Sequence, residues 1–398
     1  MLAESMRYQI SNKNELYGAG GYYDSSLPES AIGAIEDHGT YRVQRLAEVY
    51  AGSHYKRVPC NIVSDDSAFL ETVSSIFASI NAEYNYCAPS LAFEIENCFI
   101  HDSVIYLNGK PGPAIFYPTH RGNDRPFVRL LDKADGATLN AKVFNARGRR
   151  AFYLASAGSF NYGHWLVDDL PRVKWLLDSC RPTTIILQSF PGMDKIRAES
   201  IAALLSQSQV NLRFMDQGET LAFKNLTYVS PISFHPYVKN LAAVTYIRGV
   251  VRQRLGTGLV KSERLFIKRR PERGRSLTNL AEVEALLGTF GFSSIDPEDY
   301  GFEDQAKIFS GAKVIVGTMC AAMCNSLFTQ SGAQLVYLAP DGWAEPFYWD
   351  LASLLGHSYS AVHGPRAGLS DLPHLDNFAI NIELLKSMLA STSELGEA

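Results

Sequence analysis

The sequence contains no stretch approaching about 18 uninterrupted apolar residues, and so offers no candidate for a membrane-spanning helix. Residues 1–21 lack the charged-then-apolar layout of a signal peptide. The formal net charge is −4, so no global basic field attracts nucleic acid or an acidic membrane. We therefore expect a cytoplasmic protein that binds no nucleic acid, reaches the inner face of a membrane only in peripheral association, and recognises anions through local groups.

Cysteine is scarce as well, with six residues whose spacings match neither a zinc site nor a disulfide framework. Cys320 and Cys324 would share one face of a helix, but two ligands do not make a structural metal site. We expect the cysteines to be small buried apolar residues and the chain to bind no metal.

The remaining composition is that of a globular protein with room for two domains. Hydrophobic residues make up 46% and charged residues 20% of the 398 residues. Residues 1–150 are β-rich or irregular, with strands expected at 91–100 and 103–109. From residue 151, strands alternate with helices of about a dozen residues, which indicates βαβ units and parallel sheets in an α/β fold.

The alternation forms two runs, joined near residues 231–262, that indicate two Rossmann-like halves. Ligands of open α/β sheets bind beyond the carboxyl ends of the strands, so each strand-to-helix junction is a candidate site. The expected strands are 151–156, 183–189, 211–215, 225–230, 264–269, 292–297, 313–317, 334–340 and 358–364. The expected helices are 164–177, 194–207, 238–256, 278–291 with Thr278 as N-cap, 302–312, 321–332, 345–356 and 377–391.

The first junction, residues 159–169, reads SFNYGHWLVDD. In a helix over 164–177, His164 and Asp168 are neighbours that lie nearly opposite the apolar stripe, so we expect them to face solvent or a cleft. Pro171 is expected to kink or restart this helix. The pair fits either a solvated helix start or an acid/base pair that takes a proton from an incoming hydroxyl. The apolar stripe consists of Leu166, Leu170, Val173 and Leu177.

The second junction, KRRPERGR at residues 268–275, concentrates basic side chains in an acidic protein. Arginine forks suit phosphate oxygens in bidentate geometry. The alternative is a solvated basic loop, which is what most basic runs are. The position at a strand's carboxyl end makes a phosphate site as plausible as such a loop.

The third junction, KVIVGTMCAAMCNSLF at residues 313–328, places small residues between a buried strand and a helix. Small residues let a ligand approach backbone amides, and a helix N-terminus favours an anion; close helix–sheet packing explains them equally well. The fourth junction, 340–346, carries Trp343, which either flanks a base or caps the core. Gln305 either faces a cleft or is an ordinary surface amide.

Four sequence segments, three of which overlap these junctions, follow one another in an order that resembles the glycosyltransferase family 61. This group is often labelled capsular polysaccharide biosynthesis proteins. The resemblance covers roughly residues 150–365. The segments are NYGHWLVDDLPR (161–172), RRPERGRSLTN (269–279), DQAKIFSGA (304–312) and VGTMCAAMCN (316–325).

The resemblance implies a GT-B-like fold of two facing Rossmann-like domains. The expected domains are a β-rich N-terminal region (1–150) packed on an acceptor domain (151–240), a nucleotide-sugar donor domain (241–375), and a C-terminal helix and tail (376–398). The implied reaction moves a sugar from a nucleotide sugar, a UDP-sugar by expectation, to a hydroxyl of a glycan or lipid-linked glycan of the capsule, exopolysaccharide or lipopolysaccharide type. No further cofactor is implied.

The resemblance also assigns site residues to the two domains. It places His164 and Asp168 on the acceptor side, and we favour Asp168 as the base, with His164 orienting it or touching the donor. On the donor side it points to Arg269, Arg275, Asn279, Gln305, Gly317, Thr318, Met319, Cys320, Ala321 and Asn325.

The sequence has no convincingly placed Asp-x-Asp segment of the kind that commonly holds the metal of a transferase. The adjacent pair Asp65 and Asp66 lacks that spacing and reads as a loop. Arginines and a helix N-terminus can stabilise the leaving diphosphate instead. We therefore expect the transfer, which we take to be inverting, to be independent of a metal.

Two alternatives to this reaction stay open, one of them because of a departure from the family pattern. Met319-Cys320-Ala321 stands where the family usually has His-Gly-Ala, so an imidazole that could touch the diphosphate is missing. This departure motivates the first alternative, a GT-B-like nucleotide- or glycan-binding protein without transfer activity. The second, a sugar-phosphate-modifying α/β enzyme, is open independently of it.

Overall fold

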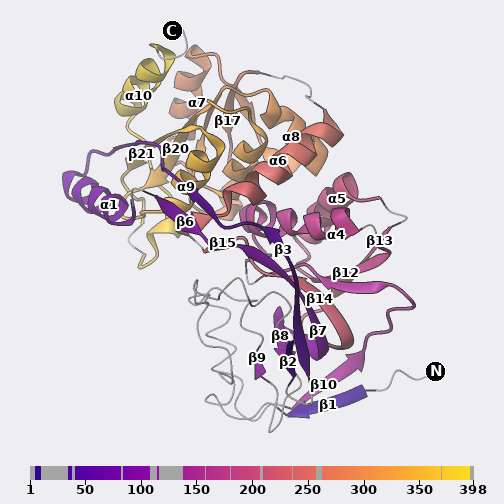
Figure 1. The fold of residues 1–398 in the computed structure, drawn as a ribbon. Helices are drawn as coiled ribbons and strands as arrows, with labels where there is room; N and C mark the ends of the chain where they lie inside the picture. Colours follow the sequence, from indigo (N-terminus) through magenta and orange to yellow (C-terminus); the bar gives the residue numbers. More distant parts are fainter. Residues whose placement is uncertain are drawn as a thin grey trace. The chain divides into compact units, whose positions relative to one another are not determined.

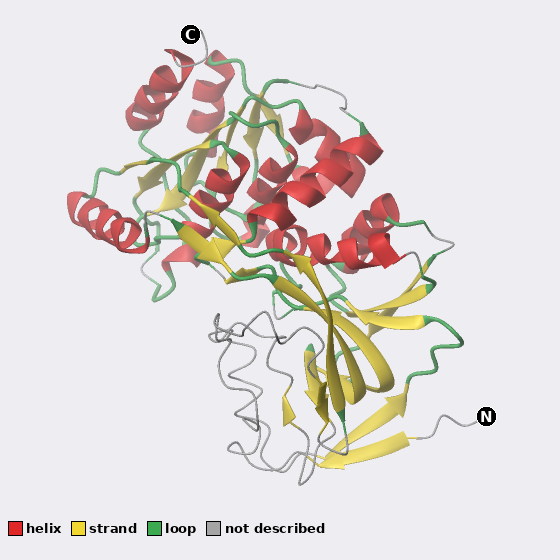
Figure 2. Ribbon diagram, viewed as in Figure 1, coloured by secondary structure: helices red, strands yellow, loops and turns green. Residues whose placement is uncertain are grey.

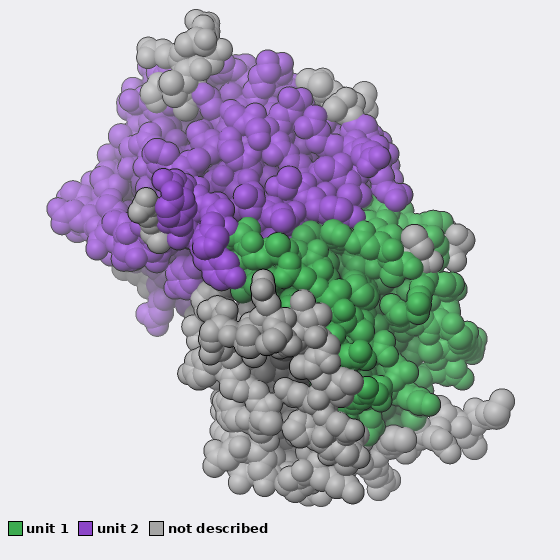
Figure 3. All heavy atoms as spheres, in the orientation of Figure 1, with its two compact units in different colours: residues 1–53, 87–234 green, residues 54–86, 235–398 purple. Residues whose placement is uncertain are grey.

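The protein divides into two compact units, which we call unit 1 (residues 1–53 and 87–234) and unit 2 (residues 54–86 and 235–398), coloured separately in Figure 3. Segment 54–86 therefore belongs with the C-terminal half, whereas the sequence pattern groups it with residues 1–150; the predicted domain boundaries stay a prediction. The computed structural model describes residues 5–9, 35–37, 41–81, 84–107, 114–115, 138–156, 158–179, 181–206, 209–234, 236–256, 262–368 and 370–394.

Unit 1 contains a mixed sheet whose parallel part has the strand order β13-β12-β11-β14; Figure 1 labels β12, β13 and β14. In chain order this is 3-2-1-4, the order of one half of a Rossmann fold. The order reverses between β11 and β14, so the topological switch point of this sheet lies at their carboxyl ends. The strands are β11 (Arg150–Tyr153), β12 (Thr183–Gln188), β13 (Val210–Met215) and β14 (Thr220–Val229).

Strands that precede β11 in the chain extend the same sheet. β7 pairs antiparallel with β14, whereas β10 pairs parallel with the start of β14. β7 and β8 form a hairpin whose turn contains Asp102 and Ser103 at positive φ, which confirms the expected strand pair. The further strands of unit 1 are β1 (Ser5–Gln9), β2 (Ile35–Asp37), β3 (Arg42–Tyr50), β7 (Ser90–His101), β8 (Val104–Leu107), β9 (Ala114–Ile115), β10 (Thr138–Val143) and β15 (Ser233–Phe234).

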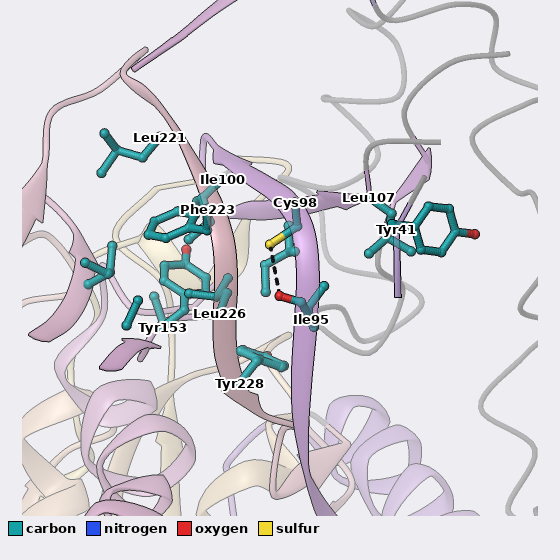
Figure 4. Packing of buried hydrophobic residues seen from close by; sticks show 14 of the residues in the cluster. Tyr41, Ile95, Cys98, Ile100, Leu107, Tyr153, Leu221, Phe223, Leu226 and Tyr228 are labelled. Atoms are coloured by element: carbon teal, nitrogen blue, oxygen red, sulfur yellow. Dashed lines mark hydrogen bonds between the residues drawn. The ribbon is translucent and has the colours of Figure 1, made fainter. Parts of the chain in front are cut away.

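The core of unit 1 forms where β7 and β14 lie side by side (Figure 4). Cys98 belongs to this cluster together with Ile95 and Leu226, and burial raises the pKa of its thiol. Cys87, Cys98, Cys320 and Cys324 are buried as expected, but Cys60 is exposed, so the expectation is wrong there. Cys180 lies outside the described residues.

Unit 2 contains a sheet in which every pairing is parallel, in the order β18-β17-β19-β20-β21-β5. Its first five strands follow the doubly wound order 2-1-3-4-5, with the switch point between β17 and β19. Their near-continuous apolar runs fit burial on both faces. The strands are β5 (Cys60–Val63), β17 (Arg264–Ile267), β18 (Ser293–Ile295), β19 (Val314–Thr318), β20 (Gln334–Pro340) and β21 (Ser358–Gly364).

Segment 54–86 is held in unit 2 by a strand and by a buried carboxylate. β5 forms the edge of the sheet by pairing with β21. Asp350 of helix α9 (Pro346–Leu355) accepts bonds from Arg57 Nε at 3.0 Å and Lys239 Nζ at 3.1 Å, and all three side chains are buried. Two short strands, β4 (Ser53–Tyr55) and β6 (Asn85–Cys87), pair at the ends of the segment.

Helices (red in Figure 2) pack on the strands of unit 2, and their boundaries follow local capping. α6 runs unbroken through Gly249 and starts at the cap Asn240, whose side chain accepts from Ala243 N. The N-cap of α7 is Asn279, so the prediction of Thr278 as the cap is wrong. The Thr278 hydroxyl donates to Phe378 O instead. The remaining bounds are α1 (Ser67–Ile80), α5 (Asp194–Leu204), α6 (Leu241–Leu255), α7 (Leu280–Thr289), α8 (Phe302–Ser310) and α10 (Ile382–Glu394), with β16 at Val238–Lys239.

The predicted α/β class is confirmed, and within the described ranges no helix is both long and apolar enough to cross a membrane. In unit 2, the expected helices 321–332 and 377–391 differ from the structure as follows. Residues 321–328 form a 3-10 helix in place of an α-helix over 321–332. α10 begins at Ile382 rather than at 377, because Phe378 bridges to Leu277 and Arg366 in an extended conformation.

Two glycines provide a matched test of this packing. A Cβ on Gly364 would lie 1.9 Å from Ala379 O, whereas a Cβ on Gly249 in α6 would meet nothing within 4 Å. We expect Gly364→Ala to destabilise the protein by roughly 1–3 kcal/mol through overpacking. Gly249→Ala should stabilise it by about 0.5–1 kcal/mol because alanine is the better helix former. Urea unfolding measures both; shifts of the two variants in the same direction would contradict the packing.

Candidate functional site

The segment after β11 is not the single α-helix expected over 164–177. It consists of a short α-turn, α3 (Tyr162–His164), a π-helical turn (Trp165–Asp169), a 3-10 turn (Leu170–Val173) and α4 (Lys174–Ser179). Pro171 lies at the start of the 3-10 turn, which confirms the expected restart. The wider π turn changes which side chains face inward, and all five of its residues are buried.

Asp168 is therefore buried, and the expectation that it faces solvent or a cleft is wrong. Its side chain is 1% exposed, whereas that of His164 is 19% exposed. His164 Nδ1 lies 2.7 Å from Asp168 Oδ2, so the predicted contact of the pair is confirmed. The Ser233 hydroxyl donates to Asp168 Oδ1. These three side chains meet at the switch point of unit 1, since His164 follows β11 and Ser233 follows β14.

Ser233 was missed in the sequence. The signal that could have found it is its place just after the expected strand 225–230, because the carboxyl ends of neighbouring parallel strands meet at one edge of a sheet.

The backbone before the helix fixes the position of the imidazole. Asn161 caps the helix and accepts hydrogen bonds from Gly163 N at 2.8 Å and His164 N at 3.5 Å. A Cβ on Gly158 would lie 2.8 Å from His164 Cγ, so the chain there approaches the ring as closely as only glycine allows. His164 is thus held by its own backbone, by Gly158 and by Asp168.

A second buried network lies beside the first, around the adjacent carboxylate Asp169. Asp169 pairs with the fully buried Arg172 and accepts from Ser159 Oγ at 2.6 Å. Arg172 also donates to Tyr228 OH at 3.2 Å and to Val229 O at 3.0 Å. The two neighbouring carboxylates therefore differ in partner: one binds an imidazole and the other a guanidinium.

At the switch point of unit 2, the basic loop 268–275 separates into paired and unpaired cations. Three of its five basic side chains form ion pairs with carboxylates, and these are Lys268 with Glu284, Arg270 with Asp296 and Asp299, and Arg273 with Glu298. In the described part of the chain, Arg269 and Arg275 form no ion pair and donate only to carbonyl oxygens, Arg269 to those of Arg273 and Gly274. These are the two arginines that the sequence motif selects.

Arg275 connects three of the predicted junctions. Its Nη1 donates to Met319 O at 2.7 Å, and its guanidinium lies 4.3 Å from the centre of the Trp343 ring. Burial lowers the pKa of Arg275 from its ordinary value. Its backbone φ is +51°, a conformation that is uncommon outside glycine and that clusters at functional sites.

The loop after β19 is packed more tightly than a ligand cradle requires. A Cβ on Gly317 would lie 2.6 Å from Met323 Sδ and 2.9 Å from Ile267 Cβ, so the glycine serves strand–helix packing. Thr318, Met319 and Cys320 are at most 3% exposed, and Ala321 is partly exposed. The loop contacts the basic segment through the Met319 carbonyl, which accepts from Arg275.

The three amide side chains predicted as donor ligands, those of Asn279, Gln305 and Asn325, form hydrogen bonds within the protein. Asn279 exchanges two bonds with the backbone of Ile380, at 2.9 and 3.0 Å. Asn325 Nδ2 donates to Gln305 Oε1 at 2.8 Å, and Gln305 donates to Tyr300 O. Both Gln305 and Asn325 are buried, so neither a cleft nor a surface position describes Gln305.

Among the described residues, no three His, Cys, Asp or Glu side chains come together as metal ligands. The pair Asp65 and Asp66 has structural partners. Asp66 caps α1 by accepting from Phe69 N at 3.0 Å, and Asp65 accepts from Asn381 Nδ2 at 2.8 Å.

Residues from both switch points lie within one stretch that is similar to a known family. Residues 162–336 match the family model Glycosyltransferase 61. The GT61 resemblance read from the sequence is confirmed over these residues, which include His164 and Ser233 of unit 1 and Arg275 of unit 2. GT61 implies glycosyltransferase activity with a sugar donor and a glycan acceptor. No curated protein matches the chain.

The burial of Asp168 yields a stability prediction. Asp168→Ala leaves the buried Ser233 hydroxyl and the partly exposed His164 without their acceptor, so we expect a loss of about 1–3 kcal/mol in the free energy of unfolding. The matched control is Asp178→Ala, in α4, where the carboxylate is 53% exposed and the loss should stay below about 0.5 kcal/mol. Urea unfolding compares them, and equal losses would show that Asp168 is not held as described.

Proposed function

We propose that the chain is a glycosyltransferase that moves a sugar from a nucleotide sugar to a hydroxyl of a glycan acceptor, with inversion and without a divalent cation. The observation that carries the proposal is the His164–Asp168–Ser233 array at the switch point of unit 1, inside the GT61 match. A GT-B-like fold belongs to the proposal, because each unit contains a sheet with a Rossmann or doubly wound strand order. An acceptor of the capsule, exopolysaccharide or lipopolysaccharide type rests on the family resemblance.

The geometry favours His164 as the base, which reverses the preference drawn from the sequence. Asp168 is buried and engaged by two side chains, whereas His164 is partly exposed. With Nδ1 held by the carboxylate, the proton of the acceptor hydroxyl would pass to Nε2. Asp168 then fixes the tautomer and stabilises the imidazolium, as the aspartate does in a Ser-His-Asp triad.

The transfer step balances without a further reactant. The acceptor oxygen bonds to the anomeric carbon as its proton moves to His164, and the bond from that carbon to the diphosphate oxygen breaks. The electron pair leaves on the diphosphate, whose growing charge needs stabilisation.

Arg269 and Arg275 are the proposed diphosphate ligands, since their described partners are neutral carbonyls and an arginine fork fits phosphate oxygens. The substitution of the family's histidine by Met319 does not remove this site. Met319 holds Arg275 through its main-chain carbonyl, a contact that any residue at this position can make. UDP is the proposed nucleotide, on the family resemblance.

The base assignment predicts a large loss of turnover on removal of the imidazole. We expect His164→Ala to lower kcat by about 10²–10⁴-fold, the usual contribution of a positioned base. The measurement is UDP release from a panel of UDP-sugars with mixed oligosaccharide acceptors, in buffer containing a chelator.

His101→Ala is the matched control for the base. His101 is 16% exposed, also lies beside an aspartate, and contacts Thr220 at the opposite end of β14. It should keep full turnover. Equal activity of the parent and His164→Ala, or activity only after magnesium or manganese replaces the chelator, would overturn the mechanism.

The donor assignment predicts a difference between neighbouring arginines. Arg269→Ala and Arg275→Ala should each weaken UDP binding by about 1–3 kcal/mol, on the order of tenfold or more in Kd. Arg273→Ala should leave it unchanged, because Arg273 is 58% exposed and paired with Glu298. Calorimetric titration with UDP measures all three, and Arg275→Lys tests whether charge alone suffices. An unchanged Kd in both Arg269→Ala and Arg275→Ala would remove this loop from the donor site.

A further inference from the structure

Phe160 is a large apolar side chain that unit 1 leaves in water. It is 55% exposed, although burying a phenylalanine is worth roughly 1.5–3 kcal/mol. It follows β11 and directly precedes Asn161, the cap of the helix that carries His164. Single exposed apolar side chains are common on protein surfaces, but this ring lies beside the helix that carries His164 and contacts a second aromatic ring.

The residues on both sides of Phe160 are fixed by hydrogen bonds. Ser159 is fully buried, donates to Asp169 Oδ2 at 2.6 Å, and accepts from Ser156 N at 2.7 Å. Asn161 N donates to Gly158 O at 2.9 Å. The ring is therefore presented outward by anchored neighbours, and its exposure is a property of the fold.

A second aromatic ring comes from the end of the neighbouring strand. Phe190 follows β12, and its ring centre lies 6.1 Å from that of Phe160 in an edge-on arrangement. Its backbone N donates to Asp194 Oδ1 at 2.9 Å, and its ring centre lies 5.6 Å from the buried guanidinium of Arg197. Phe190 thus contacts Phe160 edge to face from the end of the adjacent parallel strand.

We propose that Phe160, supported by Phe190, forms a stacking platform for a sugar ring of the acceptor glycan. Pyranose rings have an apolar C–H face that packs on an aromatic face while their hydroxyls stay hydrated. The platform lies at the carboxyl ends of β11 and β12, where ligands of such sheets bind, and in the unit that contains His164. The identification of the ligand as the acceptor rests on the proposed function; glycan stacking itself does not.

The first experiment measures glycan binding without a donor, so that it is independent of transfer. The labelled full chain is applied to an array of defined α- and β-linked oligosaccharides of hexoses, pentoses, deoxyhexoses and N-acetylhexosamines. We expect the parent to bind a subset of these glycans. Phe160→Ala should weaken that binding by about tenfold, the scale of one aromatic contact, and Phe160→Trp should restore it.

Two variants distinguish aromatic stacking from a general apolar contact and from an unspecific surface effect. Phe160→Leu keeps an apolar side chain without a π face, so it should bind as weakly as Phe160→Ala. Tyr84→Ala removes a side chain that is 56% exposed in unit 2 and should bind as the parent does. The platform is overturned if the parent binds no glycan on the array, if Phe160→Ala binds normally, or if Phe160→Leu retains full binding, as a protein or lipid contact would predict.

The second experiment distinguishes failure of the platform from failure of the proposed function. In the transfer assay, Phe160→Ala should raise the acceptor KM about tenfold with kcat and donor KM unchanged. Transfer that depends on His164 but not on Phe160 overturns the platform alone. Glycan binding that depends on Phe160 in a chain without transfer supports the platform and overturns the proposed function.

Discussion

The fully buried ion pair between Arg172 and Asp169 is the interaction on which the rest of the unit 1 site depends. Through Asp169 it holds Ser159 in the loop after β11, and through Arg172 it holds Tyr228 and the Val229 carbonyl of β14. One pair thereby joins the two strands that flank the switch point. Two desolvated charges are costly to bury, and removal of one partner leaves the other uncompensated, at roughly 3–5 kcal/mol.

In unit 2, Arg275 forms no ion pair among the described residues, although the charge of Glu345 acts on it. Arg275 is fixed by a carbonyl oxygen and an aromatic face, which orient the guanidinium without neutralising it. Arg270 and Arg273, in the same loop, are neutralised by acidic side chains. The loop therefore combines side chains paired with carboxylates and two arginines, Arg269 and Arg275, that form no ion pair among the described residues.

Much of the fold could be predicted from the sequence, and the failures have physical reasons. Short apolar runs that alternate with helices along the chain identified the parallel strands, because strands buried on both faces are apolar over nearly their whole length. The π turn was missed since its register depends on tertiary contacts, among them the bond from Trp165 Nε1 to Ser200 Oγ. The pairing of β5 with β21 was not predicted, because nothing in the sequence of either strand indicates its distant partner.

The candidate site was predictable in part for similar reasons. The contact of His164 with Asp168 follows from helical spacing. The choice of Arg269 and Arg275 came from the family motif, because the sequence alone does not distinguish the five basic residues of the loop. Only the positions of distant carboxylates distinguish those cations. The family motif predicts Asn279, whose amide can donate and accept hydrogen bonds, as a donor ligand. In the structure both amide atoms bond to the backbone of Ile380.

The edge strand β5 has a consequence for the order in which the protein can be completed during synthesis. Its Cys60 pairs with Tyr359 of β21, so an early segment acquires its partner only when most of the chain has left the ribosome. All segments of unit 1 are available once residue 234 has emerged, and domains generally fold as units during translation. Segment 54–86 would then remain a loop projecting from a folded unit 1, with unpaired strand groups that a chaperone or a second nascent chain could bind before β21 arrives.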